Sequence, residues 1–553
     1  MNLVNKNQYI YAVLSVICLI LFFRLFTINN GMLTDSYVNL IISQNLEEFF
    51  VNTPSGVFNE NLIYPLLIKI FSIGFNPLTS PIIINFLALF GASCFLFKIC
   101  LKYSESLIAS FLTALFFIIN PIILFWVARP MPDILFCFFA VLFFYIAIFT
   151  QNRLLKILVF TVLCLIRTEG ILLIPLFFIN KKFKTKDFIY IAISVSILII
   201  VFFVFNLGGG INFKIAFDNI KDIDIKNNLF KHINSFFYVF QIPVMIFLGA
   251  GLLYLFKFEK NNRKFFYIFI PVIIYFGMNV FWKYVQFRHY IPFIPFLLIL
   301  ICVFFKYMIK ETEKFSRHLT LFLILFVLYT CFDIYKVSYY RIENSKNVMQ
   351  DVYEAGIYAQ EQNYPIIASN INDVLKYFDI TNNLIIFDDW ETILENIEKN
   401  DIYFILSQYR LSKFPEFEFL EEIKIFKSNY KVFYPCVPCE QYENTWNWEI
   451  MKGKQVDYKT VIYKLNRIAF LSFFIQNALD LKDFALSAFY CDKMLNISKK
   501  LDENSLKEIK KIYYMAAMTA KNSQSKLKFG KKALNINVES DIDENLEYLL
   551  NSK

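Results

Sequence analysis

The segment Gly31-Met32-Leu33-Thr34-Asp35-Ser36-Tyr37 follows an apolar run over residues 8–28 that is long enough to cross a lipid bilayer. Asp35 is therefore expected a few residues beyond the end of a membrane span, where a carboxylate stays ionised beside hydrocarbon. The apolar spacing after Asp35 predicts a helix that lies on the membrane surface. Because the first run lacks a short apolar core with a small-residue cleavage site, we interpret it as a retained span and not as a signal peptide.

The composition of the whole chain places it among polytopic α-helical membrane proteins. Its 553 residues are 57% hydrophobic and 19% aromatic, and the mean hydropathy of +0.49 excludes the soluble class. Apolar runs dominate as far as Asp333, and from Tyr339 onward charged residues mix with apolar ones as in a water-soluble domain. We therefore predict a transmembrane domain over residues 1–338, a small soluble α/β domain over 339–460 and a helical-repeat region over 461–553.

The net charge of +9 does not indicate nucleic acid, because the basic residues cluster beside apolar segments, where they set the orientation of membrane spans. By this rule the amino terminus is cytoplasmic and the soluble carboxy-terminal part is extracytoplasmic. About nine crossings and one helical hairpin, roughly eleven segments in all, are expected. The crossings are expected near residues 8–28, 81–101, 105–127, 131–150, 187–206, 236–256, 265–281, 290–306 and 318–335.

The hairpin is expected over residues 154–180, an apolar stretch that is interrupted by Arg167-Thr168-Glu169-Gly170. Basic residues flank the stretch on both sides, so the positive-inside rule places both of its ends in the cytoplasm. The polar tetrad then marks the tip at which the chain enters the membrane region and returns.

This topology brings the unusual polar residues of the membrane half to the extracytoplasmic face. A protein that needs only to span the bilayer has little reason to place acids and arginines at helix ends that dip toward lipid. The segments concerned are Asp35, the 50–80 loop with Tyr64-Pro65, the turn from Arg129 to Asp133, the tip Arg167-Thr168-Glu169, the loop 208–232, and the stretch from Lys283 to Tyr290.

The soluble part begins with short apolar runs that alternate with helical patterns, which predicts a small α/β layer. A glycine-rich phosphate loop is lacking, so no nucleotide is assigned. From Asn466 the pattern is all-helical, and Leu495-Asn496-Ile497 recurs as Leu534-Asn535-Ile536, thirty-nine residues later. This spacing suggests two tetratricopeptide-like helical hairpins. Strands are expected over 365–369, 384–387 and 402–406, and helices over 373–378 and 390–399.

Most of the ten cysteines fall in apolar runs, where a thiol acts as a small hydrophobic side chain. Cys436 and Cys439 form the one CxxC pair, whose spacing suits a disulfide, a redox pair or half of a zinc site. With no second CxxC and three histidines, zinc is disfavoured. A disulfide is preferred if this domain is extracytoplasmic.

Each candidate residue of the membrane half also has a purely structural interpretation. Asp35 suits the amino-terminal cap of a helix. Asp133 with Arg129, and Arg167 with Glu169, suit simple ion pairs at helix ends. The predicted topology favours a functional site for Asp35. For Asp133 both interpretations stay open, and for Arg167 with Glu169 the structural interpretation is preferred.

Two further segments carry the same ambiguity. Tyr64 precedes Pro65 and is compatible with the start of a second surface helix. Arg288 and Tyr290 are residue types that often anchor spans at the membrane surface. A guanidinium also holds phosphate oxygens by two hydrogen bonds, so Arg288 is a candidate phosphate ligand.

Taken together, these motifs resemble the GT-C class of integral-membrane glycosyltransferases, the superfamily of the protein O-mannosyltransferases and the lipid A aminoarabinose transferase. The resemblance covers roughly the first 335 residues and depends on the order and common side of short motifs. They are Asp35-Ser36-Tyr37 with Tyr64-Pro65-Leu66-Leu67, Ala128-Arg129-Pro130-Met131-Pro132-Asp133, and Arg288-His289-Tyr290-Ile291-Pro292.

The resemblance implies transfer of a sugar, with inversion, from a polyprenyl-phosphate donor to a lipid, glycan or protein acceptor. Asp35 would be the general base and Asp133 a second catalytic residue that orients the acceptor or raises basicity. Arginines would stabilise the departing lipid phosphate, Arg288 first and then Arg129 and Arg167. The expected substrate-binding residues are Tyr64, Arg129, Arg167, Glu169, Arg288, His289 and Tyr290.

The sequence departs from that class in two places. Family members often carry a second acid after the first, and a Lys or His with two prolines in the later motif. Here Ser36 and Ile63-Tyr64-Pro65 occupy these places, which weakens the case for a divalent metal. No metal ligand and no other cofactor are assigned.

Two other classes compete with the transferase hypothesis. A lipid or glycan transporter or flippase would line a path across the membrane with charges and tends to show paired broken helices. A non-catalytic membrane scaffold would use the repeats to bind protein. A cavity at Asp35 that opens to lipid would favour the transferase, and a charged path that reaches both faces would favour transport.

Overall fold

The computed structural model describes most of the chain. Expectations for the span 187–206, for residues 208–224 and 283–286, and for Cys436 and Cys439 lie outside the described residues. These are 3–26, 34–44, 63–150, 152–178, 225–258, 263–281, 287–315, 317–344, 349–377, 380, 384–387, 390–408, 416–432, 454–498, 501–540 and 542–551.

The chain forms two compact units. The first comprises Met1–Gln350 with Ser428–Asp457, and the second comprises Asp351–Lys427 with Tyr458–Lys553. The predicted division into three domains is not tested by this result and stays a prediction.

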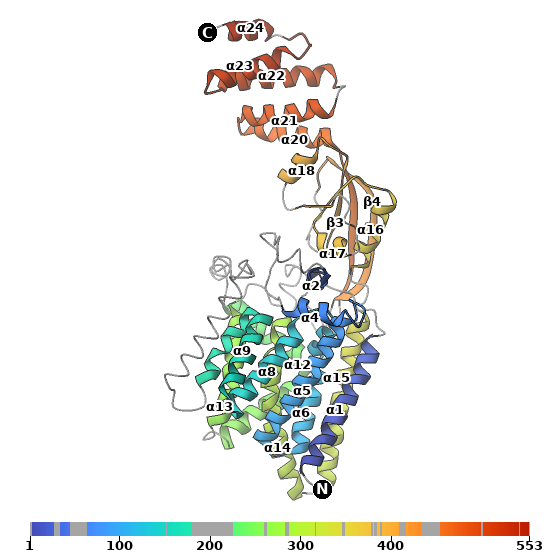
Figure 1. The fold of residues 1–553 in the computed structure, drawn as a ribbon, viewed down its shortest axis with the longest axis vertical. Coiled ribbons are helices and arrows are strands. Elements are labelled where there is room, and N and C mark those ends of the chain that lie inside the picture. The colour runs from blue at the N-terminus through green and yellow to red at the C-terminus, as the bar shows by residue number, and fades with distance from the viewer. Residues whose placement is uncertain are drawn as a thin grey trace. The chain divides into compact units, whose positions relative to one another are not determined.

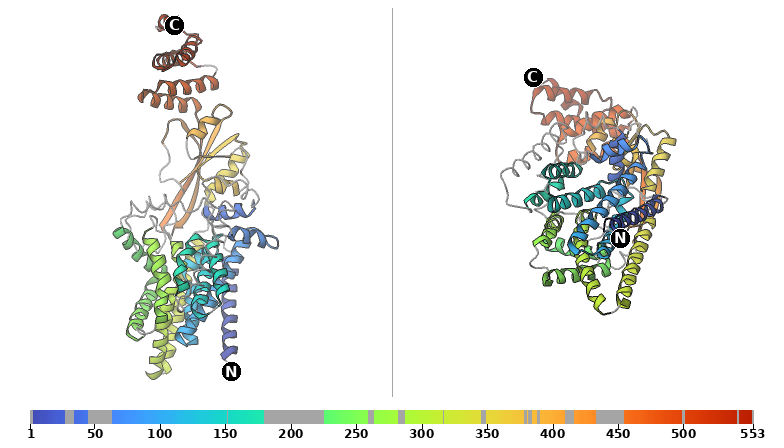
Figure 2. Two further views of the ribbon diagram at one scale, coloured as in Figure 1. Left: turned by 60° about the vertical axis from the view of Figure 1, so that its left-hand side comes forward. Right: turned by 60° about the horizontal axis from the view of Figure 1, so that its bottom comes forward.

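The first unit is a bundle of helices, many of which pack side by side (Figure 1). Neighbouring pairs include α5 with α6, α5 with α8, α8 with α9, and α12 with α14. Figure 2 shows the same bundle from two other directions. The elements are α1 (Leu3–Phe26), α2 (Thr34–Gln44), α4 (Ile63–Phe71), α5 (Ser80–Ser104), α6 (Leu107–Ile118), α7 (Pro121–Val127), α8 (Asp133–Phe149), α9 (Arg153–Ile166), η1 (Thr168–Phe178), α12 (Ile225–Phe258), α13 (Arg263–Val280), η2 (Phe287–Tyr290), α14 (Ile294–Phe315) and α15 (Arg317–Asn344).

The outer faces of several helices are apolar, as expected of helices in contact with lipid. In α1, Ile20 and Phe23 are more than half exposed, and in α15 the same holds for Tyr329 and Phe332. Within the described residues, α1 and α5 are long and apolar enough to cross a membrane, and α6 with α7 adds a third span if the bent pair is counted as one. The expected number of crossings stays a prediction.

The crossing expected near 105–127 stays a prediction, and the helix there is broken. α6 and α7 meet at an angle of 53°. Pro121 has no N–H with which to continue the hydrogen-bond ladder, and the side chain of Asn120 caps the amino terminus of α7 by accepting from the N–H of Ile122 and Ile123. After the break, α7 ends at Val127, just before the turn that leads to Asp133.

The predicted hairpin is present, since α9 and η1 pack against each other. The returning limb is a 3-10 helix that contains Pro175. A Cβ atom on Gly170 would come within 3.0 Å of backbone atoms of Leu163 and Cys164, so glycine allows the chain to turn back tightly against α9. The hairpin thereby brings Arg167 and Glu169 to its tip.

A five-stranded sheet of order β2-β1-β3-β5-β4 belongs mainly to the second unit. β1 lies between β2 and β3 and is parallel to both, whereas β5 runs antiparallel to β3. The first three strands and the helices between them occur where the sequence predicts them. The elements are α16 (Gln350–Glu361), β1 (Ile366–Ser369), α17 (Asn372–Tyr377), β2 (Leu384–Ile386), α18 (Trp390–Asn396), β3 (Ile402–Ser407), β4 (Leu420–Val432) and β5 (Lys454–Leu465).

The carboxy-terminal part of this unit consists of paired helices. α20 packs on α21, and α22 packs on α23. The recurring Leu-Asn-Ile triplets fall at the ends of α21 and α23. The tetratricopeptide-like character of the pairs stays a prediction. The helices are α20 (Arg467–Asp480), α21 (Phe484–Ile497), α22 (Glu503–Thr519), α23 (Ser523–Leu534) and α24 (Asp543–Asn551).

A buried acid in the second unit makes its stability depend on pH. Asp351 is 2% exposed, and burial raises its pKa from 3.8 to about 6 although Oγ1 of Thr460 donates a hydrogen bond to it (2.6 Å). The folded form therefore binds more protons between these two values, so its stability falls as the pH rises from about 4 to about 6, by up to about 3 kcal/mol.

Asp351→Asn is expected to remove this loss. Thermal unfolding of the full chain in detergent, followed at pH 4 to 7, should show the variant and the wild type diverging as the pH rises, with the variant more stable at pH 7. Parallel curves for the two proteins would contradict the assignment to Asp351.

Candidate active site

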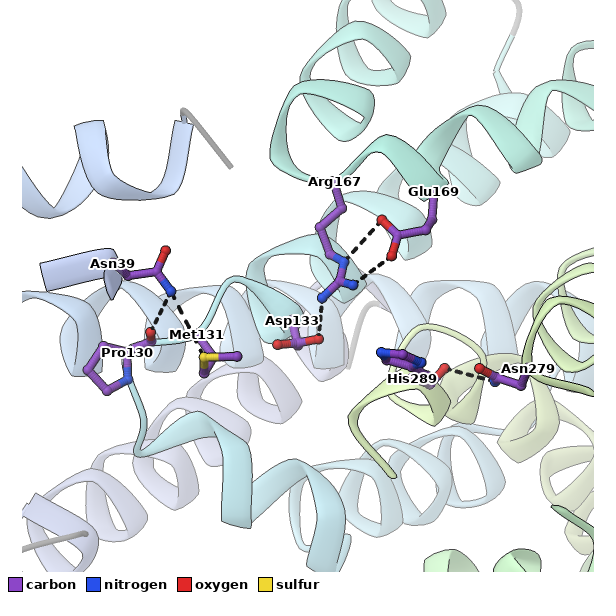
Figure 3. Close-up of polar contacts among 8 residues, drawn as sticks. All are labelled: Asn39, Pro130, Met131, Asp133, Arg167, Glu169, Asn279 and His289. Carbon is purple, nitrogen blue, oxygen red and sulfur yellow. Dashed lines mark hydrogen bonds and ion pairs between the residues drawn. The ribbon is translucent and has the colours of Figure 1, made fainter. Parts of the chain in front are cut away.

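The guanidinium of Arg167 is held between two carboxylates at the tip of the hairpin (Figure 3). Nη1 donates to Oδ1 of Asp133 at 2.7 Å, and Nη2 and Nε donate to the two carboxylate oxygens of Glu169 at 2.6 and 3.2 Å. The side chains of Arg167 and Asp133 are 12% and 2% exposed. A two-pronged arginine–carboxylate pair with a second acid is a rigid arrangement that fixes three side chains at once.

Helix ends bring these groups together. Asp133 is the first residue of α8, where the positive end of the helix dipole favours a carboxylate. Arg167 is the residue after α9, and Glu169 lies in the first turn of η1. The structural interpretation of these residues pairs Arg129 with Asp133 and Arg167 with Glu169. The pair of Arg167 and Glu169 is present, and Asp133 forms an ion pair with Arg167.

The turn η2 adds a second guanidinium to this cluster. Arg288 acts electrostatically on Asp133, and His289 is coupled in the same way to Glu169 and Arg167. The backbone of η2 is fixed by Asn279 of α13, whose Nδ2 donates to the carbonyl of His289 at 3.3 Å (Figure 3). The cluster thus combines residues of α8, the hairpin and η2.

Tyr290 points away from solvent and is paired with a histidine that the sequence analysis does not single out. Its hydroxyl group is hydrogen-bonded to Nδ1 of His232 in α12, and both side chains are buried. Their rings also pack together. The contact between Tyr290 and His232 joins η2 to α12. Tyr290 therefore helps to position Arg288 and His289, which precede it in η2.

Arg129 and Tyr64 are fully buried. The guanidinium of Arg129 lies 3.5 Å from the ring centre of Phe125, and Nη1 donates to the Phe125 carbonyl. The hydroxyl group of Tyr64 donates to Oδ1 of Asn85 at 3.2 Å. Arg129 and, through Asn85, Tyr64 therefore help to hold the turn before Asp133.

Two asparagines hold the same turn and are not among the residues that the sequence predicts for the site. Nδ2 of Asn85, in α5, donates to the carbonyl of Arg129 at 2.6 Å. Nδ2 of Asn39, in α2, donates to the carbonyl of Pro130 at 3.1 Å (Figure 3). Burying a polar side chain costs free energy unless it finds a hydrogen-bond partner. An asparagine beside apolar residues in a helix is therefore the sequence signal that could have indicated Asn85 and Asn39.

Asp35 lies in the first turn of α2, four residues before Asn39. Residues four apart share a face of a helix. Asp35 therefore stands on the face of α2 that carries Asn39, while its side chain lies outside the described residues. Helices at both predicted surface segments, α2 and α4, are confirmed.

Within the described part of the chain, no three His, Cys, Asp or Glu side chains are grouped closely enough to hold a metal ion. The histidines near the cluster whose side chains the structure describes are His289 of η2 and His232 of α12. The geometry of the described residues is that of an ion-pair cluster at the end of an apolar bundle.

No protein-family model matches this sequence, and no curated protein matches it. The structure is similar to two crystal structures of ArnT from Cupriavidus metallidurans, one in the apo state and one bound to undecaprenyl phosphate. Each comparison has 10% sequence identity and covers 82% of this chain and 97% of the other, with TM-scores of 0.49 and 0.45.

The likeness to these two structures concerns the fold alone. At 10% identity and with TM-scores below 0.5, they assign neither a substrate nor a site residue to this chain. Both have to be inferred from the side chains described above.

Proposed function

We propose that this protein is a membrane glycosyltransferase that moves a sugar from a polyprenyl-phosphate donor to an acceptor on the extracytoplasmic side. The observation that carries the proposal is the cluster of Asp133, Arg167 and Glu169 with Arg288 beside it. Its members come from distant parts of the chain and meet at the ends of apolar helices. Ionisable groups so placed are costly, and they mark sites of chemistry or of charged ligands.

A transfer of this kind needs two functions from the protein. A base takes the proton of the attacking acceptor hydroxyl group, and a cation stabilises the phosphate that departs. The acceptor oxygen forms a bond to the anomeric carbon while the bond from that carbon to the phosphate oxygen breaks. The proton passes to Asp35, and the lipid phosphate leaves with both bonding electrons. Because the acceptor attacks the face opposite the departing phosphate, the configuration at the anomeric carbon is inverted.

The contacts of the three arginines support Arg288 as the phosphate ligand. Arg129 is fully buried against Phe125, and Arg167 is bound by two carboxylates. Arg288 lies in the turn η2, whose backbone is held by Asn279, and its side chain is partly exposed and acts electrostatically on Asp133. A guanidinium in this place can bind a phosphate by two hydrogen bonds beside the proposed second acid.

Asp133 supports acceptor binding in the same proposal. One carboxylate oxygen is occupied by Arg167, and the second, Oδ2, is buried and has no hydrogen-bond partner among the described residues. A buried carboxylate oxygen gains most from a donor such as a sugar hydroxyl group. The apolar helices around the cluster would hold the isoprenoid chain.

The proposal is tested by incubating membranes that contain the full chain with a panel of labelled polyprenyl-phosphate sugars. Transfer of label from at least one donor to an acceptor in the membrane or in added glycan or protein is expected. Membranes without the protein are the control. No transfer from any donor would contradict the proposal.

Arg288→Ala is expected to lower kcat/KM for the lipid-phosphate donor by roughly 10- to 100-fold, because one charge-assisted contact to phosphate contributes about 1.5–3 kcal/mol. Arg288→Lys should recover part of the loss, since the charge remains but the two-pronged geometry does not. The KM for the acceptor should change little, and Arg153→Ala, at the far end of α9, serves as the matched control. A larger effect on the acceptor than on the donor would count against a phosphate ligand.

A further inference from the structure

The turn between α7 and α8 cannot satisfy all of its backbone hydrogen-bonding groups by itself. It runs Arg129-Pro130-Met131-Pro132, and neither proline has an N–H to donate. The N–H of Met131 bonds back to the carbonyl of Arg129 at 2.7 Å, which makes a tight turn. Buried carbonyl groups in such a turn need donors from elsewhere in the chain.

Two buried asparagine side chains supply those donors. Asn85 of α5 reaches the carbonyl of Arg129, and its own Oδ1 accepts from the hydroxyl group of Tyr64 in α4. Asn39 of α2 reaches the carbonyl of Pro130, and its Nδ2 also lies 3.9 Å from Sδ of Met131 (Figure 3). The turn is therefore bound directly to α5 and α2 and, through Asn85, to α4, within four residues of Asp133.

We infer that Asn39 and Asn85 are positioning residues that fix the spacing between the two proposed catalytic acids, Asp35 and Asp133. The inference rests on the proposed function. Asn39 is one helical turn from Asp35 in α2, and its bond ends on Pro130, three residues before Asp133. This hydrogen bond thus joins the helix of the base to the turn of the second acid.

Neither asparagine needs to touch substrate for this role. Asn39 is 6% exposed and Asn85 is fully buried. Loss of the Asn39 amide would leave α2 without this bond to the turn, and a shift of about 1 Å between reacting groups costs roughly 100-fold in rate. Binding of the donor depends on Arg288 and the apolar helices, and should be little affected.

Asn39→Leu, which keeps the size of the side chain and removes the amide, is therefore expected to lower kcat by about 10- to 100-fold, with the donor KM nearly unchanged. Asn39→Gln retains an amide and should recover part of kcat. Asn152→Leu removes a comparable asparagine, the exposed cap of α9, and should leave kcat within about twofold of wild type. If the leucine variant does not fold, Asn39→Ala replaces it with the same expectation.

A double-mutant comparison separates positioning from loss of folded protein. In an Asp35→Asn background the base is already absent, so Asn39→Leu should lower the residual rate by less than about twofold. An equal loss in both backgrounds would show a purely structural role and overturn the inference, as would full activity of Asn39→Leu. Absence of transfer by the wild-type protein would instead contradict the proposed function.

Discussion

Asp35→Asn is expected to lower the rate of sugar transfer by about 100- to 10,000-fold, the range typical of losing a general base. The amide has the shape of the carboxylate but cannot accept the proton of the attacking hydroxyl group. Asp35 stands in the first turn of α2, on the helix that Asn39 joins to the turn before Asp133. Transfer is measured with purified protein and a labelled lipid-phosphate sugar.

Two companion variants sharpen the test of Asp35. Asp35→Glu keeps a carboxylate at a changed distance and should retain more activity than Asp35→Asn. Asp502→Asn exchanges an exposed cap of α22 in the second unit and should have no effect. Transfer at the wild-type rate by Asp35→Asn would remove Asp35 from the catalytic role.

Arg167→Met is expected to destabilise the protein by about 3–5 kcal/mol, because it leaves the buried carboxylate of Asp133 and the partly exposed carboxylate of Glu169 without the cation that they share. The free energy of unfolding is measured in mixed detergent micelles. Transfer activity should also be lost, since Asp133 is no longer held. A loss of stability below about 1 kcal/mol would mean that the triad is not buried as described.

Neutralising the two acids separates the structural from the catalytic part of this effect. Adding Asp133→Asn and Glu169→Gln to Arg167→Met removes the uncompensated charges and should restore most of the stability. Activity should stay low, because the second acid is still missing. Recovery of full activity in this triple variant would contradict a role for the cluster in transfer.

The local elements of the fold follow from the sequence. The strands β1, β2 and β3 are short β-branched runs between helical patterns, and these signals survive in the structure. The long strands β4 and β5 are absent from the sequence predictions, although Leu420–Val432 and Lys454–Leu465 include alternating apolar and polar residues. Periodicity therefore indicates the elements, while the strand order arises from pairing between distant segments.

The candidate site is less predictable because its contacts join distant segments. Arg129 is four residues before Asp133 in the sequence, which suggests an ion pair between them. In the structure the guanidinium of Arg129 packs on the ring of Phe125, and Asp133 forms an ion pair with Arg167. The partner of Asn39 is a carbonyl group ninety-one residues away. No helical or strand period encodes such a bond.

The most direct test of the central claim is a stoichiometric measurement on proteoliposomes that contain the purified full chain and a doubly labelled polyprenyl-phosphate sugar. The account predicts that each sugar transferred to acceptor is matched by one molecule of free polyprenyl phosphate, and that Arg288→Ala and Asp35→Asn lower both in parallel. Recovery of the donor intact, or its movement across the bilayer with the sugar still attached, would contradict it.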